Sequence, residues 1–258
     1  NPLAKQAFET LLLEDDPGRF ARLSFDVDEN PVAAYLNQGV RPRIAILRQQ
    51  ESMGHVNLAA AFDLAGFDCV DIHMHDLIQG RIYLKDFQGL AICGTFSYND
   101  VLGAGYAWAQ TILHQAVLHD QFAAFFSRSD TFVLGIANGA QMLSYLRNMI
   151  VGAELWPSFE RNISNQFEAR LVMVEVGDSN SMWLEGMAGS QLPVNIAHSY
   201  GRSVINTPAQ NLNGPSGRSN QAHSHFDRCG FAGSIGAQKP NNFAFIKNNY
   251  FICALCCS

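Results

Sequence analysis

The stretch most able to support chemistry is residues 134–143, which reads LGIANGAQML. An apolar run, 131–136, leads into a small-residue turn and a helix-like stretch, which is the pattern of a nucleophile elbow: a strand, a sharp turn and a helix. Gly135 and Gly139 flank the apex of the turn, where a tightly bent backbone needs small neighbours. The apex residue is Ala137, whose methyl group cannot attack a substrate. The sequence therefore predicts the form of an active centre without its reactive atom.

Three other residues near this turn carry reactive groups. Cys93 ends the preceding apolar run, and we interpret it as a packing thiol, because structural cysteines are usually inert. Thr95 and Ser97 lie in the loop that follows, but no base is evident beside them. None of the three is predicted to replace the missing nucleophile.

Two groups of residues invite a metal interpretation. His73 and His75 alternate around the end of an apolar run, but no third ligand is near them in the sequence. Cys253, Cys256 and Cys257 have a spacing that can chelate zinc, yet no partner pair stands at zinc-finger spacing. We predict no metal site and interpret the cysteines as part of a divergent tail.

The composition is that of a folded domain. Of 258 residues, 48% are hydrophobic and 16% are charged, which argues against global disorder. The formal net charge of −6 gives no reason to expect a nucleic-acid partner. No stretch reaches the ~18 apolar residues that span a bilayer, so no membrane partner is expected. The scattered cysteines show no secreted disulfide framework, so we predict a cytoplasmic location.

Strand-like and helix-like stretches alternate from residue 43 onward. This order is typical of βαβ units with a largely parallel sheet, in which sites form at the carboxyl ends of the strands. Gly66 suits the end of the first helix. The predicted strands are 43–47, 68–74, 89–93, 131–136, 167–176 and 191–197, and the predicted helices are 54–65, 103–126 and the elbow helix up to 147.

The chain is predicted to have three parts. Residues 1–40 are a linker with the remnant of a preceding region, and its start without Met suggests a processed chain or a piece of a longer one. Residues 41–202 form the α/β domain. Residues 203–258 are rich in Asn, Ser and Gly without a sustained period, so we expect a divergent and poorly ordered tail. A domain that ends near residue 202 should lack its final strand and leave a sheet edge uncovered, which favours aggregation.

Long stretches of residues 20–202 carry a family resemblance. They are LSFD at 23–26, RPR at 41–43, AAAF at 59–62, AGFD at 65–68, DIHM at 71–74, FSY at 96–98, DVLGAG at 100–105, ELWP at 154–157, RN at 161–162, FEAR at 167–170 and GSQ at 189–191. With these motifs the region resembles the C-terminal glutaminase domain of bacterial phosphoribosylformylglycinamidine synthase. The resemblance implies a class I glutamine amidotransferase fold, a flavodoxin-like three-layer α/β sandwich.

The resemblance also implies a chemistry. In that family a Cys at the elbow attacks the side-chain amide of glutamine, a His positioned by a Glu moves protons, and backbone N–H groups stabilise the oxyanion. Ammonia then passes to an ATP-dependent synthetase region. The implied partners are glutamine and a synthetase domain or subunit. No cofactor belongs to this chain, since ATP and Mg would belong to the synthetase region.

Matching the family residue by residue gives the candidate site. The oxyanion loop would comprise Gly94, Thr95 and Asn138. Gln141 and His198 would contact glutamine, although Gln141 is equally well explained as a helix-surface residue and His198 is better explained as a strand-end histidine.

The catalytic parts of the family pattern are not intact. Ala137 stands where the family has its nucleophilic Cys, and Ala140 where it usually has a second Cys. Thr95 and Asn99 replace loop glycines. The His-Pro-Glu motif that supplies the base does not occur in the sequence. We therefore predict no glutaminase activity.

Three explanations stay open at this point. The first is a non-catalytic product of gene decay or truncation, with a replaced tail. The second is a retained module that binds glutamine or docks on a synthetase. The third is an engineered Cys→Ala change at Ala137, against which the further losses at Thr95, Asn99 and Ala140 argue.

Overall fold

The computed structural model describes most of the α/β region and parts of both flanks. The described residues are 20–30, 32–33, 39–49, 54–94, 105–153, 156–178 and 183–204, a few isolated positions before residue 20, and the backbone of three short strands after residue 230.

A six-stranded sheet forms the centre of the molecule. The order of its strands is β10-β11-β4-β3-β1-β2. All of them run parallel to one another except β10, which is antiparallel to β11. The first four strands are β1 (Arg43–Arg48), β2 (Asp68–His73), β3 (Gly89–Ile92) and β4 (Phe132–Ile136). The α/β fold with a largely parallel sheet predicted from the sequence is thus confirmed, and its four predicted core strands lie within a residue or two of the expected bounds.

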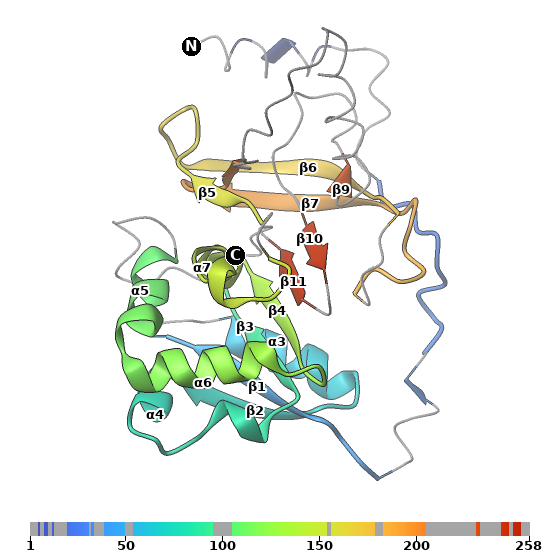
Figure 1. Cartoon of the computed structure of the whole chain (residues 1–258). Coiled ribbons are helices and arrows are strands. Elements are labelled where there is room, and N and C mark those ends of the chain that lie inside the picture. Colours follow the sequence, from blue (N-terminus) through green and yellow to red (C-terminus); the bar gives the residue numbers. More distant parts are fainter. Residues whose placement is uncertain are drawn as a thin grey trace, which may run out of the picture.

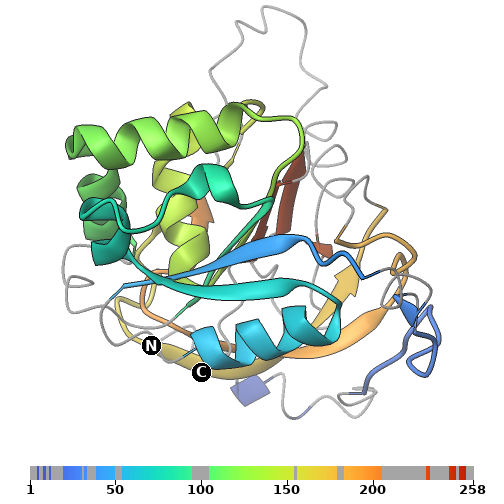
Figure 2. The ribbon, with the colours of Figure 1, turned by 90° about the horizontal axis from the view of Figure 1, so that it is seen from below.

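Helices cover both faces of this sheet, as Figure 2 shows. Side chains that alternate along a strand point to opposite faces. In β1, Ile44 and Ile46 pack with α3 (His55–Leu64), whereas Ala45 and Leu47 belong to the larger core with α5 (Tyr106–His114) and α6 (Ala116–Ser127). Burial on both faces explains why the strands read as continuous apolar runs.

The end of α3 follows from one glycine. Gly66, predicted to end this helix, has φ +89°, which a residue without Cβ adopts readily. Its N–H donates to the Asp63 carbonyl at 3.0 Å, and the Phe67 N–H donates to the Phe62 carbonyl at 3.0 Å. These two bonds form a Schellman motif, and the Phe62 and Phe67 rings complete it at 5.4 Å between centroids.

The prediction of a single helix at 103–126 is wrong, because the structure has two helices in this region. Two helices, α5 and α6, meet at Gln115, whose backbone is extended at φ −106° and ψ 110°. Each helix then places its own apolar side chains against the sheet, for example Trp108 from α5 and Phe122 from α6. No Gly or Pro marks the break, so tertiary packing and not a local breaker separates the two helices.

Short elements complete the domain. They are α4 (Met74–Ile78), η1 (Leu84–Asp86), the elbow helix α7 (Asn138–Tyr145), η3 (Arg147–Met149), β5 (Ser158–Glu160) and β8 (Arg202–Val204). β5 and β8 pair with each other in an antiparallel ladder. This ladder lies next to α7, because the Ser144 hydroxyl donates to the Pro157 carbonyl just before β5.

A long hairpin forms a separate layer. β6 (Glu168–Val176) and β7 (Gln191–His198) are antiparallel, and β9 (Phe231–Ala232) pairs with the end of β6. In Figure 1 this hairpin lies above β4 and α7, and Val176 at the end of β6 packs with Leu134 of β4. It also holds the segment before the domain, since the Arg22 and Gln191 backbones exchange bonds of 2.8 and 2.7 Å.

Residues from the predicted tail enter both sheets. β10 (Ala244–Lys247) and β11 (Tyr250–Cys253) extend the central sheet, and β9 extends the hairpin. The expectation of an uncovered sheet edge at β4 is wrong, because β11 pairs with β4 in parallel from Tyr250 to Cys253. Most of residues 203–258 lie outside the described residues.

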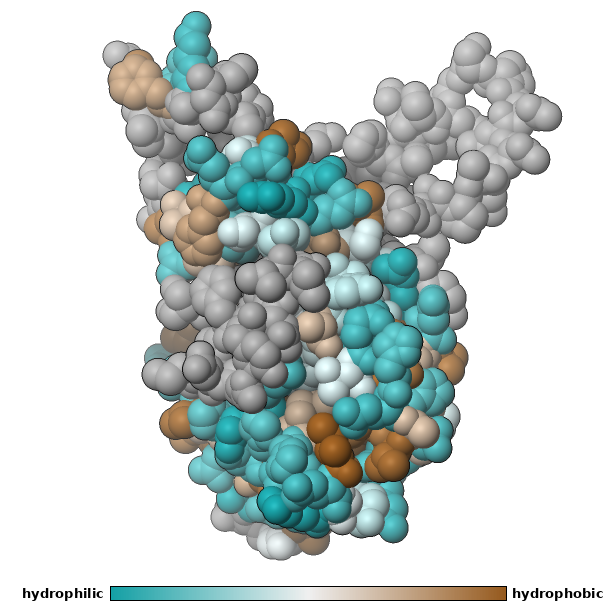
Figure 3. Space-filling model, turned by 90° about the vertical axis from the view of Figure 1, so that its left-hand side faces the viewer, coloured by the Kyte–Doolittle hydropathy of each residue, from teal (hydrophilic) through white to brown (hydrophobic). Residues whose placement is uncertain are grey.

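The described surface is mixed in polarity. On the face that Figure 3 shows, hydrophilic residues predominate among those described and the hydrophobic ones lie in small groups. Such isolated groups are ordinary at a protein surface. Among the described residues, no helix is long and apolar enough to cross a membrane.

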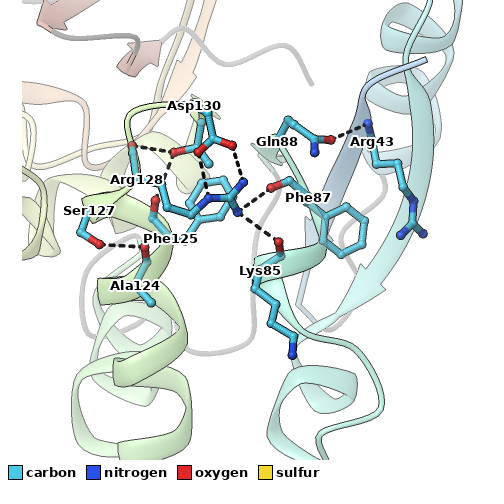
Figure 4. A network of polar contacts seen from close by, with 10 residues as sticks. Arg43, Lys85, Phe87, Gln88, Ala124, Phe125, Ser127, Arg128 and Asp130 are labelled. Carbon is cyan, nitrogen blue, oxygen red and sulfur yellow. Dashed lines mark hydrogen bonds and ion pairs between the residues drawn. The ribbon is translucent and has the colours of Figure 1, made fainter. Parts of the chain in front are cut away.

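Arg128, at the end of α6, bonds to the segment just before β3, as Figure 4 shows. Its guanidinium donates to the carbonyls of Lys85 and Phe87 at 3.1 and 3.0 Å. It also forms a bidentate ion pair with the Asp130 carboxylate, with Nε donating to Oδ1 at 3.0 Å and Nη2 donating to Oδ2 at 2.8 Å. Hydrogen bonding to Asp130 raises the pKa of Arg128, so the cation is held in place between the two segments.

We expect Arg128→Ala to lower the free energy of unfolding by roughly 1–2 kcal/mol, because two backbone carbonyls lose a charged donor. Urea unfolding followed by circular dichroism measures this. The matched control is Asp130→Asn, which keeps both carbonyl contacts and should change stability much less. An Arg128→Ala chain as stable as the parent would show that this contact does not hold β3 in place.

Candidate functional site: an elbow without a nucleophile

The predicted elbow is present, and its apex is strained. Ala137 lies between β4 and α7 with φ 51° and ψ −116°. A residue with a Cβ seldom adopts a positive φ, and such a conformation costs on the order of 1–3 kcal/mol unless the surroundings impose it. Only 4% of Ala137 is exposed. The geometry expected of a nucleophile is therefore kept by a side chain that carries no nucleophilic atom.

Close packing imposes this geometry. A Cβ on Gly94, at the end of the β3 segment, would lie 2.3 Å from the Ala137 Cβ and 2.9 Å from the Ile136 carbonyl oxygen. A Cβ on Gly139 would lie 2.5 Å from the Ile92 carbonyl oxygen. A Cβ on Gly135 would meet the Leu143 side chain at 2.6 Å. The small residues predicted around the apex are needed because β4, α7 and the end of β3 meet here without room for larger side chains.

The candidate oxyanion loop is only partly described. Gly94 is buried against Ala137, and Asn138 begins α7, where the first N–H groups of a helix have no partner within it. Thr95 and the neighbouring Ser97 and Asn99 lie outside the described residues. The structure thus brings Gly94, Ala137 and Asn138 together, while Thr95 stays a prediction.

Gln141 lies one turn beyond the apex and is buried, with 3% of its surface exposed. The interpretation of Gln141 as a helix-surface residue is therefore wrong. Its backbone N–H donates to the Ala137 carbonyl at 3.1 Å, and its side-chain amide donates to the Tyr200 carbonyl. The carboxamide that was expected to contact glutamine is bonded to the chain's own backbone.

His198 ends β7 and is buried. Its Nδ1 lies 3.1 Å from the Asn162 carboxamide oxygen. That oxygen can only accept, so Nδ1 carries the proton and donates. A Cβ on Gly201 would lie 2.1 Å from the imidazole, so the chain turns back tightly over the ring. The strand-end position is confirmed, and His198 is linked to Gln141 through the turn that contains Tyr200.

Sequence reasoning missed two residues of this arrangement. Asn162 holds the turn after β7, and only its place in the quoted pair Arg161-Asn162 could have drawn attention to it. Gly105 precedes α5 at φ 72°, and a Cβ there would lie 2.4 Å from the Met142 backbone nitrogen. Gly105 thus lets α5 start directly against the elbow helix.

The other sequence candidates lie apart from the apex chemistry or serve packing. Cys93 is buried at the end of β3, and its Sγ donates to the Leu47 carbonyl at 3.4 Å. His73 caps α4: its Nδ1 accepts the His75 N–H at 3.1 Å, and the Asp76 carboxylate accepts the His73 N–H at 3.2 Å. Among the described residues no three His, Cys, Asp or Glu side chains gather in a way that could hold a metal.

The family of the chain follows from a comparison with protein-family models. The model of the CobB/CobQ-like glutamine amidotransferase domain matches residues 41–229. The chain belongs to this family. The elbow between β4 and α7 is accordingly an amidotransferase elbow, and the match extends past residue 202 into the predicted tail.

Comparison with solved structures supports the fold. PurLQS from Thermotoga maritima aligns with a TM-score of 0.60 at 18% identity, over 83% of this chain and 86% of that one. A glutamine amidotransferase from Thermotoga maritima aligns at a TM-score of 0.49 and 13% identity, over 84% of this chain and 76% of that one. At these identities the first alignment supports the fold alone.

The close approach at the amidotransferase elbow predicts that Gly94→Ala is destabilising by about 2–3 kcal/mol, since the added methyl meets fixed atoms of Ala137 and Ile136. Gly186→Ala separates this clash from backbone strain. Gly186 has φ +76° with nothing within 4 Å, so its substitution should cost only about 1 kcal/mol. Urea unfolding of both variants provides the comparison, and equal losses would contradict the clash.

The His73 cap predicts a pH dependence. Burial, and then the nearby charge of Arg48, lower the pKa of His73 below its ordinary 6.5. The unfolded chain therefore binds this proton more readily than the folded chain. Stability from His73 is full above pH 6.5 and is lost as the pH falls through the lower folded pKa.

We expect His73→Asn, which can still cap the helix, to lose less stability than the parent between pH 7.5 and pH 5. Chemical unfolding at both pH values measures the difference. His114→Asn, at an exposed position of α5, is the matched control. If the parent and the His73→Asn chain lose the same stability on acidification, His73 does not contribute to the pH dependence.

Proposed function

We propose that this chain is a glutaminase-like domain of the phosphoribosylformylglycinamidine synthase type that no longer hydrolyses glutamine. The observation that carries the proposal is Ala137, which occupies the strained apex of the amidotransferase elbow with φ 51°. The surroundings of the apex are those expected of the family: the flanking glycines, the buried first turn of α7 and the end of β3 packed against it. At the position of the nucleophile the chain has a methyl group, which cannot form a bond to the substrate.

The expected reaction shows what is missing. Glutaminase chemistry in this family needs a thiolate to attack the carboxamide carbon, a base to move protons, and N–H donors for the oxyanion. We propose Gly94 and Asn138 as such donors, since both lie beside Ala137. The thiolate is replaced by the Ala137 methyl, and the sequence contains no His-Pro-Glu motif. Loss of a nucleophile alone lowers turnover by about 10⁶-fold in a well-studied protease, so oxyanion donors cannot sustain useful activity.

The synthase type is supported by residues outside the elbow. The quoted motifs between residues 20 and 202 resemble that family, and PurLQS shares the fold over most of both chains. The partners that we propose for the ancestral domain are glutamine and a synthetase. ATP and Mg would be used by the synthetase and not by this chain.

A retained binding module is the second candidate. It is favoured by the intact packing of the elbow, since the sheet is covered on both faces and the glycines still fit their neighbours. Calorimetry with L-glutamine and co-purification with a synthetase separate the two candidates. Binding of either partner would support a module, whereas a folded chain that binds neither would support loss of function.

We expect the purified chain to release no ammonia from glutamine above a heat-inactivated control in a coupled assay. Ala137→Cys should remain roughly 10²–10⁴-fold below a working glutaminase, because the sequence lacks the His-Pro-Glu motif that supplies the base in this family. Ala140→Cys, which places a thiol on the same helix, is the matched control. Normal turnover in Ala137→Cys would contradict the proposal and indicate that the alanine is a single engineered change.

A further inference from the structure

The turn 198–201, between β7 and β8, is bonded at every residue to one of two buried carboxamide residues. Asn162 donates from Nδ2 to the His198 carbonyl at 2.8 Å, and its backbone N–H donates to the Ser199 carbonyl at 2.9 Å. The Gly201 N–H donates to the Asn162 Oδ1 at 3.3 Å. The remaining residue, Tyr200, accepts from the Gln141 side chain.

The two carboxamides come from different parts of the domain. Asn162 follows β5 and is 5% exposed, and its Nδ2 also donates to the Gln166 carbonyl at 3.0 Å. Gln141 belongs to the first turn of the elbow helix. The turn is therefore fastened on one side to the loop after β5 and on the other side to the elbow.

The same turn lies against α7 through its backbone. The Tyr200 carbonyl accepts from the side-chain amide of Gln141, one turn beyond the apex. The Tyr145 ring, also on α7, meets the Tyr106 ring of α5 edge to face at 5.2 Å between centroids.

We propose that the turn 198–201 is a strap that closes the elbow, so that a ligand reaches residue 137 only when the strap opens. Asn162 and Gln141 hold the strap shut. In this closed arrangement the Gln141 amide is used within the chain. This inference goes beyond the proposed function, because it concerns access to the elbow and holds whether or not the domain is catalytic.

Thiol labelling of an Ala137→Cys chain tests the strap without any need for turnover. Iodoacetamide would be the probe, with the rate at each cysteine followed by peptide mass mapping. The thiol introduced at the apex should be labelled slowly when Asn162 and Gln141 are intact. Buried Cys93 reports global unfolding in the same sample, and half-buried Cys69, whose pKa is raised by burial, is the reference for a partly exposed thiol.

Opening the strap should accelerate labelling of the apex thiol alone. Adding Asn162→Ala removes several hydrogen bonds, each of which shifts an opening equilibrium roughly two- to twelvefold, so we expect an increase of about tenfold or more. Gln141→Met, which keeps the volume but cannot donate, should give a smaller increase. Asn195→Ala, the same change at an exposed position of β7, should have no effect.

The outcomes separate strap opening from unfolding. Labelling of the apex thiol as fast as that of Cys69 in the otherwise intact chain would overturn the proposal, as would a rate that neither Asn162→Ala nor Gln141→Met changes. If Asn162→Ala also exposes Cys93, that variant has unfolded, and the Gln141→Met chain, which removes only the Tyr200 contact, decides the question. Faster labelling of the apex thiol with unchanged Cys93 labelling supports the strap.

Discussion

The close approach of the β3 and β4 ends is the constraint on which the candidate site depends. Gly94 and Ala137 meet where a single added methyl would overlap, and Gly139 meets the backbone of β3 just as closely. Because these contacts involve backbone atoms, the turn between β4 and α7 has little freedom to relax. The positive φ of Ala137 follows from this packing. The elbow is therefore a property of how two neighbouring strands and one helix meet.

This constraint explains how the turn keeps the geometry of an elbow with an alanine at its apex. Backbone strain in proteins is concentrated at active sites, where it is part of the mechanism. Here the strained residue is an alanine, and the conformation is held by glycines and buried side chains that also belong to the core. The Ala137 methyl carries no reactive atom, and these contacts hold the turn without one. A folded domain with an inert apex is the expected result, and the same packing leaves the Gln141 amide to bond with the turn 198–201.

Much of the central fold could be predicted from sequence because it rests on local patterns. Apolar runs indicated the strands, and Gly66 marked the end of α3. The spacing of Gly135, Ala137 and Gly139 indicated the elbow. The break at Gln115 carries no Gly or Pro and arises from packing of two helices on the sheet, so periodicity alone missed it.

The rest of the site depends on contacts between distant residues. The bonds of Asn162 to residues 198–201 and of Gln141 to Tyr200 join segments separated by 36 and 59 positions, and no local pattern predicts them. The tail strands β10 and β11 were missed for a related reason. They are short, and they are strands because β11 lies beside β4, as Figure 1 shows. Family likeness located Gln141 and His198, but only the fold shows that both are buried.

The backbone conformation of residue 137 tests the central claim most directly. A crystal structure of this chain should show φ near 51° and ψ near −116° at Ala137, with Gly94 packed against its methyl group. That result would agree with packing as the source of the elbow geometry, with no reactive side chain at residue 137. A relaxed turn with negative φ at Ala137 would contradict the account, because the packing would then not fix the geometry of the turn.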